Sequence, residues 1–151
     1  MAGYSGPVTD RTTDVLAGRL GYLLKHAQQR LVQAAMPAMA LFGIDGRELA
    51  VLTVLSAGVP LSQQEAADQL RVDRTTMVSL IDALEAKRLV ERRRSADDRR
   101  KNIVQLTETG MDCLRDAARA RDEVDREFLA PLGDALSHDF IRALQILVRE
   151  D

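Results

Sequence analysis

Apolar residues recur every three or four positions along most of the chain, which is the period of an amphipathic helix. This pattern predicts a first helix over residues 10–39, which Pro37 should kink or end because proline lacks the backbone N–H that a helix interior needs. A second helix is expected over 47–57, after a turn bracketed by Gly43 and Gly46. The first third of the chain is therefore predicted to be helical.

Two further helices are predicted to follow one another almost directly. Ser62 and Glu65 have the spacing of a capping box, in which each side chain bonds to the other residue's backbone N–H, so a third helix should run over 62–70. Asp73 is expected to cap a fourth helix that reaches about Lys87. Only two residues separate these helices, and helices joined by so short a turn cross steeply, as in a helix-turn-helix.

The helical period changes after residue 88. Segments 89–94 and 102–106 favour two strands of a β-hairpin with a charged tip. Thr107 is then expected to cap a long fifth helix that ends at 131–133, and Ser137 to open a last helix. The sequence thus predicts a mainly α fold with a small β-hairpin. A hairpin directly after a helix-turn-helix is the order of a winged helix, whose second helix can fill the DNA major groove.

Composition excludes several classes of protein. One cysteine cannot form an internal disulfide, no apolar stretch reaches the roughly 18 residues of a membrane span, and the N-terminus lacks a signal-peptide pattern. We therefore expect a cytoplasmic protein without membrane contact. A Gly-rich phosphate loop and the motifs Gly-x-Ser-x-Gly and His-Glu-x-x-His are also missing from the sequence, so we do not expect an enzyme.

The charge is unevenly distributed along the chain. The formal net charge of −2 by itself argues against nucleic-acid binding. Residues 87–101, however, contain eight Lys or Arg and three Asp or Glu, so this window carries +5, and the remaining 13 basic and 20 acidic residues give −7. One concentrated basic patch is typical of a nucleic-acid contact. A solvated charged face is the alternative interpretation.

The ordered motifs resemble the multiple-antibiotic-resistance-regulator (MarR) family of bacterial transcription factors, over about residues 21–147. They are Ser62-Gln-Gln-Glu-Ala-Ala-Asp-Gln-Leu70, Asp73-Arg-Thr-Thr-Met-Val-Ser-Leu-Ile-Asp-Ala-Leu84, Leu89-Val-Glu-Arg92, Asp98-Arg-Arg100 and Leu106-Thr-Glu-Thr-Gly110. The resemblance implies a regulator, most often a repressor, that binds double-stranded DNA as a homodimer clasped by its first, fifth and sixth helices. The chain would then divide into a disordered tail (1–9), an N-terminal dimerisation helix (10–40), a winged helix-turn-helix (41–107) and C-terminal dimerisation helices (108–151).

The fourth helix carries the candidate base contacts. Its apolar face, made of Met77, Leu80, Ile81 and Leu84, should pack inward, which leaves an outward N-terminal half consisting of Arg74, Thr75, Thr76, Val78 and Ser79. Arg74 is the candidate for guanine, because a guanidinium can bond O6 and N7 together. The hydroxyl groups can bond phosphates or bases, and Val78 can meet a thymine methyl. Plain helix surface is the alternative for each.

The predicted hairpin carries a second set of candidates. Asp98 and Arg100 match the family's Asp-x-Arg element, which implies a carboxylate that braces an arginine entering the minor groove. Phosphates or solvent are expected to meet the other basic residues, which are Arg92, Arg93, Arg94, Arg99 and Lys101.

Two positions depart from the family pattern. The helix-ending position before Leu89 is usually glycine in the family but here is Arg88, which would cost roughly 1 kcal/mol in a left-handed conformation or end the helix differently. The position after Val78 often holds a basic residue but here is Ser79, so one phosphate contact is expected to be missing.

The remaining chemistry is sparse. In the family, small-molecule pockets form between the first, second and fifth helices, so Tyr22 and His26 are candidates to orient an aromatic or anionic effector, with core packing or dimer contact as the alternative. His138 is the only other histidine and no ligand-spaced partner accompanies it, so no metal site or cofactor is expected. Cys113 lies beside Leu114 and is interpreted as a structural thiol rather than a redox sensor.

One other class of protein fits the predicted fold. A winged helix can dock on a protein partner instead of DNA, and the outer face of its second helix is then expected to be apolar. Arg74, Thr75 and Thr76 on that face, together with the +5 window, favour DNA.

Overall fold

The computed structural model describes residues 15–149, so the tail predicted over 1–9 lies outside the described residues. The elements are α2 (Leu20–Ala40), α3 (Gly46–Leu55), α4 (Gln63–Leu70), α5 (Arg74–Ala86), β1 (Val90–Arg94), β2 (Asn102–Leu106), α6 (Glu108–Leu129), the 3₁₀ turn η1 (Ala130–Leu132) and α7 (Asp134–Val148). This mainly helical fold with one antiparallel hairpin confirms the predicted fold class.

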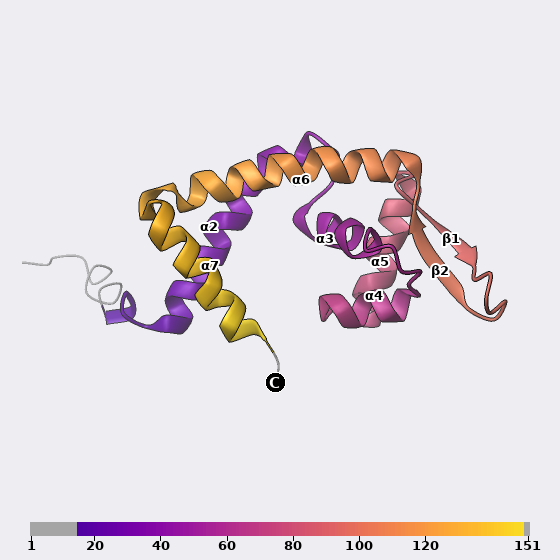
Figure 1. Ribbon diagram of the computed structural model, residues 1–151, viewed down its shortest axis with the longest axis horizontal. Helices are drawn as coiled ribbons and strands as arrows, with labels where there is room; N and C mark the ends of the chain where they lie inside the picture. The colour runs from indigo at the N-terminus through magenta and orange to yellow at the C-terminus, as the bar shows by residue number, and fades with distance from the viewer. Residues whose placement is uncertain (1–14, 150–151) are drawn as a thin grey trace, which may run out of the picture.

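The long helix α6 connects two groups of elements (Figure 1). At one end α2 lies against it and α7 turns away from it after η1, and at the other end lie α3, α4, α5 and the hairpin. No helix within 15–149 is both long enough and apolar enough to cross a membrane.

Both terminal helices differ from the prediction. The helix predicted over 10–39 is interrupted, since residues 15–16 are helical, 17–18 form a turn and α2 starts at Leu20; its predicted first residues, 10–14, lie outside the described residues. At its other end α2 does not end at Pro37 but continues to Ala40. A proline inside a helix removes one backbone hydrogen bond, and α2 continues for three more residues despite this loss. α7 begins at Asp134 and not at Ser137, because Gly133 with φ of 73° turns the chain three residues earlier. The hydroxyl of Ser137 donates instead to the carbonyl of Leu129.

The start of α3 was predicted one residue too late because its cap was overlooked. Asp45 and Glu48 form a capping box: Asp45 Oδ1 accepts the backbone N–H of Arg47 and of Glu48 at 2.8 Å, and Glu48 Oε2 accepts the N–H of Asp45 at 2.9 Å. The Asp-x-x-Glu spacing is a sequence signal for such a start. Gly46 is thus the first helical residue and not part of the preceding turn.

The helix-turn-helix forms as its caps predict. Ser62 and Glu65 make the expected capping box, and the hydrogen bonds from Ser62 lower the pKa of the Glu65 carboxyl. Asp73 accepts the N–H of Thr76 at 2.8 Å and its hydroxyl at 2.6 Å, which lowers the pKa of Asp73. Between the two helices Arg71 adopts a left-handed conformation with φ of 52°, and this lets so short a turn reverse the chain direction.

The hairpin is joined to the loop before α4 by backbone pairing. Its strands pair from Val90 with Leu106 to Arg94 with Asn102. On the outer side of β2, the N–H of Val104 donates to the carbonyl of Leu61 at 2.8 Å, so the loop before α4 adds a short third segment. The hairpin is therefore held against the helix-turn-helix by backbone bonds as well as by side chains.

The buried core lies almost entirely in the group that contains the hairpin. It consists of Met39, Ile44, Leu49, Val51, Leu52, Leu55, Leu61, Ala66, Ala67, Met77, Ile81, Leu84, Leu89, Val90, Val104 and Ala117. α6 joins this core at its first turn, where Gly110 lies so close to Leu89 that a Cβ would be 1.9 Å from the Leu89 carbonyl oxygen. Only glycine fits at position 110, which explains why Gly110 is part of the Leu106–Gly110 motif.

Candidate nucleic-acid interface

α5 has a buried face and a polar outer face, as its sequence predicts. Met77, Ile81 and Leu84 are completely buried, and Leu80 is half-buried at the edge. On the outer face Arg74, Thr75 and Ser79 are exposed, whereas Thr76 and Val78 are half-buried. The N-terminal half of α5 therefore presents a guanidinium and hydroxyl groups to the outside.

Two hollows flank this outer face. One, of about 540 Å³, lies between α4, α5 and β2 and is bordered by Arg74, Gln63 and Asn102. The other, of about 490 Å³, lies between α5 and the start of α3, where Thr75, Thr76 and Ser79 face Arg47. Of the predicted contact residues of α5, Arg74 borders the first hollow and Thr75, Thr76 and Ser79 border the second, whereas Val78 borders neither. Residues of α3 and α4 join them.

Seven of the eight basic residues of the window 87–101 fall into two groups that the sequence did not separate. Lys87 forms an ion pair with Glu48, Arg92 with Asp82 and Glu85, and Arg93 with Glu91. The cations at the tip make no ion pair with any residue of 15–149; they are Arg94, Arg99, Arg100 and Lys101. The tip therefore concentrates exposed cations that form no ion pair within the described part of the chain.

Arg92 has a structural position that sequence analysis missed. From β1 its guanidinium reaches Asp82 and Glu85 of α5, and its Nε donates to Gln63 of α4 at 2.8 Å. Burial works to lower the pKa of Arg92, but the two carboxylates outweigh it and raise the pKa. Arg92 thus ties the hairpin to both helices of the helix-turn-helix, and it is not a free phosphate ligand. No spacing rule connects residues so far apart in sequence.

Asp98 organises the tip of the hairpin. Its Oδ1 accepts the backbone N–H of Arg100 at 3.0 Å, and its carbonyl accepts the N–H of Lys101 at 2.9 Å. Within residues 15–149 no ion pair joins the side chains of Asp98 and Arg100. The carboxylate fixes the backbone from which Arg100 projects, and a brace on the guanidinium itself stays a prediction for the DNA-bound state.

Arg88 adopts the first of its two predicted alternatives, the left-handed conformation. Arg88 has φ of 59°, in the left-handed region that glycine adopts at lower cost. Its carbonyl accepts a hydrogen bond of 2.7 Å from the hydroxyl of Thr107, which in turn accepts the N–H of Gly110. The junction between α5 and β1 is thereby fastened to the start of α6.

The other candidate residues lie away from α5. The rings of Tyr22 and His26 contact each other with centroids 4.1 Å apart on α2. Neither lines the hollow of about 730 Å³ near η1, which is bordered by Arg30, Phe128 and Phe140. Burial, with the nearby carboxylates of Asp116 and Glu48, raises the pKa of the half-buried Cys113 thiol, which disfavours the reactive thiolate. No cluster of three metal-binding side chains occurs in the described part of the chain.

Several known proteins are similar to this chain in sequence and in fold. A sequence model of the MarR family matches residues 42–101. A transcriptional regulatory protein assigned to the hcr operon of Thauera aromatica is 31% identical over 137 residues, which cover 90% of this chain and 82% of that protein. The transcriptional repressor CouR bound to a 23-mer DNA duplex is 30% identical, with a TM-score of 0.84 over 91% of this chain and 97% of CouR. CouR from Rhodococcus jostii bound to p-coumaroyl-CoA is 26% identical, with a TM-score of 0.75 over 87% and 93% of the two chains.

Proposed function

Because the chain belongs to the MarR family of DNA-binding transcriptional regulators, we propose that it is a ligand-responsive repressor that acts as a homodimer on a pseudo-palindromic operator. The family consists of regulators and not of enzymes. One observation carries the proposal: the exposed polar half of α5 lies beside a hairpin whose tip holds four cations without ion-pair partners in the described chain. That arrangement matches the two grooves that a winged helix-turn-helix contacts.

The recognition helix is assigned to α5. Its N-terminal residues are placed at the base edges of the major groove, with Arg74 on a guanine and with Thr75, Thr76, Val78 and Ser79 on neighbouring bases or phosphates. The tip of the wing is placed at the adjacent minor groove, where Arg100 enters and Arg94, Arg99 and Lys101 meet phosphates. The duplex-bound CouR supports this placement through its similar fold.

The homodimer is inferred from apolar surface on the terminal helices. No residue of α7 is buried in the single chain, although the helix is strongly apolar on one side. Large exposed apolar side chains on α2 and on the segment from η1 to α7 are Leu20, Leu23, Leu24, Val32, Met36, Leu132, Leu136, Ile141, Ile146, Leu147 and Val148. A monomer rarely exposes so extended an apolar surface, so a second copy of the chain is the proposed cover.

The effector is proposed to be a small aromatic or anionic molecule. The solved complex of CouR with p-coumaroyl-CoA, an aromatic thioester with anionic phosphates, supports this class. Tyr22 and His26 offer adjacent rings for stacking, and Arg30 with Phe128 and Phe140 offers a cation beside aromatic rings in the 730 Å³ hollow. A panel of aromatic acids and thioesters, added to the protein–DNA complex, tests the proposal by release of DNA.

Arg74→Ala tests the placement of α5. The change should relax base preference at one position in each half-site, at a cost of about 1–3 kcal/mol per lost bidentate contact. The measurement is binding to a set of operator variants at fixed salt. An equal loss on every variant would make Arg74 a phosphate ligand instead.

Two substitutions in the hairpin test the placement of its tip, which is the wing of the winged helix. Arg100→Ala should weaken binding most on sites with A·T-rich flanks, since their narrow minor groove concentrates negative potential. Asp98→Ala removes a negative charge near DNA, which by simple electrostatics should tighten binding. It also removes the acceptor that orders the tip of the hairpin, which should weaken binding. We expect weaker binding. Tighter binding with Asp98→Ala, together with a uniform loss with Arg100→Ala, would reduce the wing to a charged patch.

A further inference from the structure

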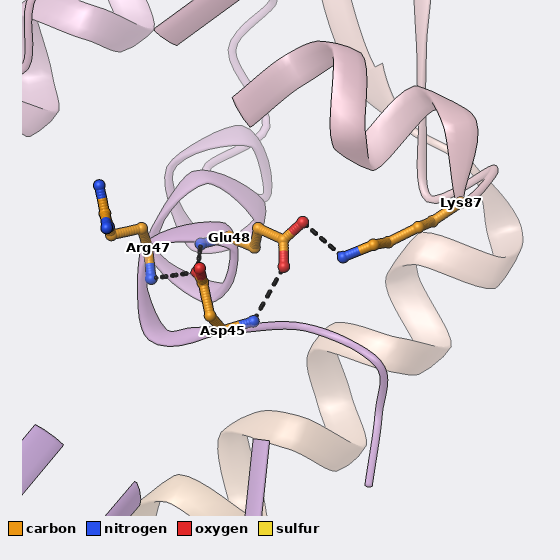
Figure 2. Close-up of polar contacts among 4 residues, drawn as sticks. All are labelled: Asp45, Arg47, Glu48 and Lys87. Carbon is orange, nitrogen blue, oxygen red and sulfur yellow. Dashed lines mark hydrogen bonds and ion pairs between the residues drawn. The ribbon is translucent and has the colours of Figure 1, made fainter. Parts of the chain in front are cut away.

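The start of α3 is joined to the end of the recognition helix by a buried carboxylate. Glu48 is only 5% exposed, and its Oε1 accepts a hydrogen bond of 2.6 Å from Nζ of Lys87, the residue that ends α5. Its other oxygen accepts the N–H of Asp45 at 2.9 Å. One side chain therefore fixes the first turn of α3 to α5, across 39 residues of sequence (Figure 2).

Arg47 lies in the same turn but takes no part in this ion pair. Its backbone N–H donates to Asp45, whereas its exposed side chain points away from Glu48 and Lys87 in Figure 2. The guanidinium makes no ion pair or hydrogen bond with another side chain of residues 15–149. The carboxylates nearest in sequence are already used, since Asp45 accepts two backbone N–H groups and Glu48 holds Lys87.

The position of Arg47 brings it beside the recognition helix. It borders the same polar hollow of about 490 Å³ as Thr75, Thr76 and Ser79, which lie on the outer face of α5. A helix in the major groove is flanked by the two phosphate backbones, so the side of α5 that faces α3 should lie next to one of them.

We propose that Arg47 contacts a phosphate of the DNA strand that borders α5, and that the Glu48–Lys87 pair holds it in that position. The inference rests on the proposed placement of α5 in the major groove. A planar guanidinium with several donors suits a phosphate, and an uncompensated arginine is drawn to the backbone. α3 then becomes a third DNA-contacting element, beside α5 and the tip of the hairpin.

Arg47→Ala is the first test, with binding measured over a range of salt concentrations. We expect about a tenfold loss of affinity or more, equal on all operator variants, because a phosphate contact carries no sequence information. The slope of log affinity against log salt should fall by roughly 2 for a dimer, one contact in each protomer. Arg47→Lys is the matched control and should keep most of the affinity, because it retains the positive charge.

Rescue provides a second readout. Adding Ser79→Lys to Arg47→Ala should restore the salt slope, since the new ammonium borders the same hollow. Lys87→Met should also weaken DNA binding. The double variant with Arg47→Ala should lose less binding free energy than the two single variants together, because the position of Arg47 no longer matters once its guanidinium is gone. Full additivity of the two changes would overturn the positioning role.

The outcomes separate this inference from the proposed function. If Arg74→Ala alters base preference as expected while Arg47→Ala leaves affinity and salt slope unchanged, the contact by Arg47 is wrong and the placement of α5 stands. A loss with Arg47→Ala that appears on only some operator sequences would overturn the phosphate assignment in favour of a base contact. If neither change affects binding, the placement of α5 fails and the inference fails with it.

Discussion

The two ends of the molecule differ in how much of their apolar surface a single chain buries. The winged helix-turn-helix buries its apolar side chains, and capping boxes, the Leu61–Val104 pairing and the Arg92 contacts fasten its parts together. α7 at the other end buries none of its residues, and α2 buries only Ala35 and Met39. We therefore expect the winged helix-turn-helix to fold on contacts within one chain, and the terminal helices to need the second copy that we propose.

The largest effect is expected at the terminal helices, where a charge should prevent the two copies from associating. Leu147→Glu removes an apolar side chain that is 70% exposed in the single chain. Burial of a leucine contributes about 1.5–3 kcal/mol, and a dimer loses it twice. Sedimentation should show that the dimer dissociates at protein concentrations at which the unchanged chain is dimeric.

The control for Leu147→Glu is Val59→Glu, which places the same charge at a 63% exposed position of the winged helix-turn-helix. It should leave sedimentation unchanged. Equal behaviour of the two variants would contradict the assignment of the interface to the terminal helices.

The next largest effect is expected inside the winged helix-turn-helix. In Gly110→Ala the new methyl group would meet the backbone of Leu89, which cannot move without opening the junction between β1 and α6. We expect a loss of about 3 kcal/mol or more in the free energy of unfolding, measured with urea. Gly21→Ala in α2, where no atom lies within 4 Å of the added methyl, should be neutral or slightly stabilising. A neutral Gly110→Ala would contradict the close packing of this junction.

A smaller effect is expected for the ion pair between α3 and α5. Lys87→Met leaves the buried Glu48 carboxylate with one hydrogen bond fewer, and we expect a loss of about 1–3 kcal/mol in the free energy of unfolding. Arg126→Met breaks the exposed pair with Glu123 and should cost less than about 1 kcal/mol. The comparison fails if the two substitutions have equal cost.

The smallest effect is a gain in stability. Arg88→Gly relieves a left-handed arginine, and we expect the free energy of unfolding to rise by roughly 0.5–1 kcal/mol, less the entropy that glycine adds to the unfolded chain. Thermal unfolding checks the sign. A clear loss would mean that the arginine side chain contributes more at this junction than its backbone strain costs.

Local signals made most of the fold predictable. Ser62, Asp73 and Thr107 begin helices where their side chains predict, because capping depends only on residues three positions apart. The wrong start at Ser137 has the same origin, since a serine also forms other hydrogen bonds and Gly133 had already turned the chain. The polar face of α5 was likewise predictable, because the helical spacing of its apolar residues defines the opposite, buried face.

Contacts between distant segments were not predictable from the sequence. Nothing near Arg92 indicates that Asp82, Glu85 and Gln63 gather around it, so its charge could not be told from that of Arg94 or Arg99. The same holds for Arg47, which reaches the recognition helix only through the packing of α3 on α5. Long-range packing thus decides which cations of a basic window remain free to meet DNA.

Selection of bound sequences from random double-stranded DNA tests the central claim most directly. If the chain is a homodimeric repressor with α5 in the major groove, the enriched sequences should form a pseudo-palindrome with half-sites about one helical turn apart. Footprints on such a site should cover both halves. Enrichment of a single asymmetric half-site, or no enrichment over the starting pool, would contradict the account.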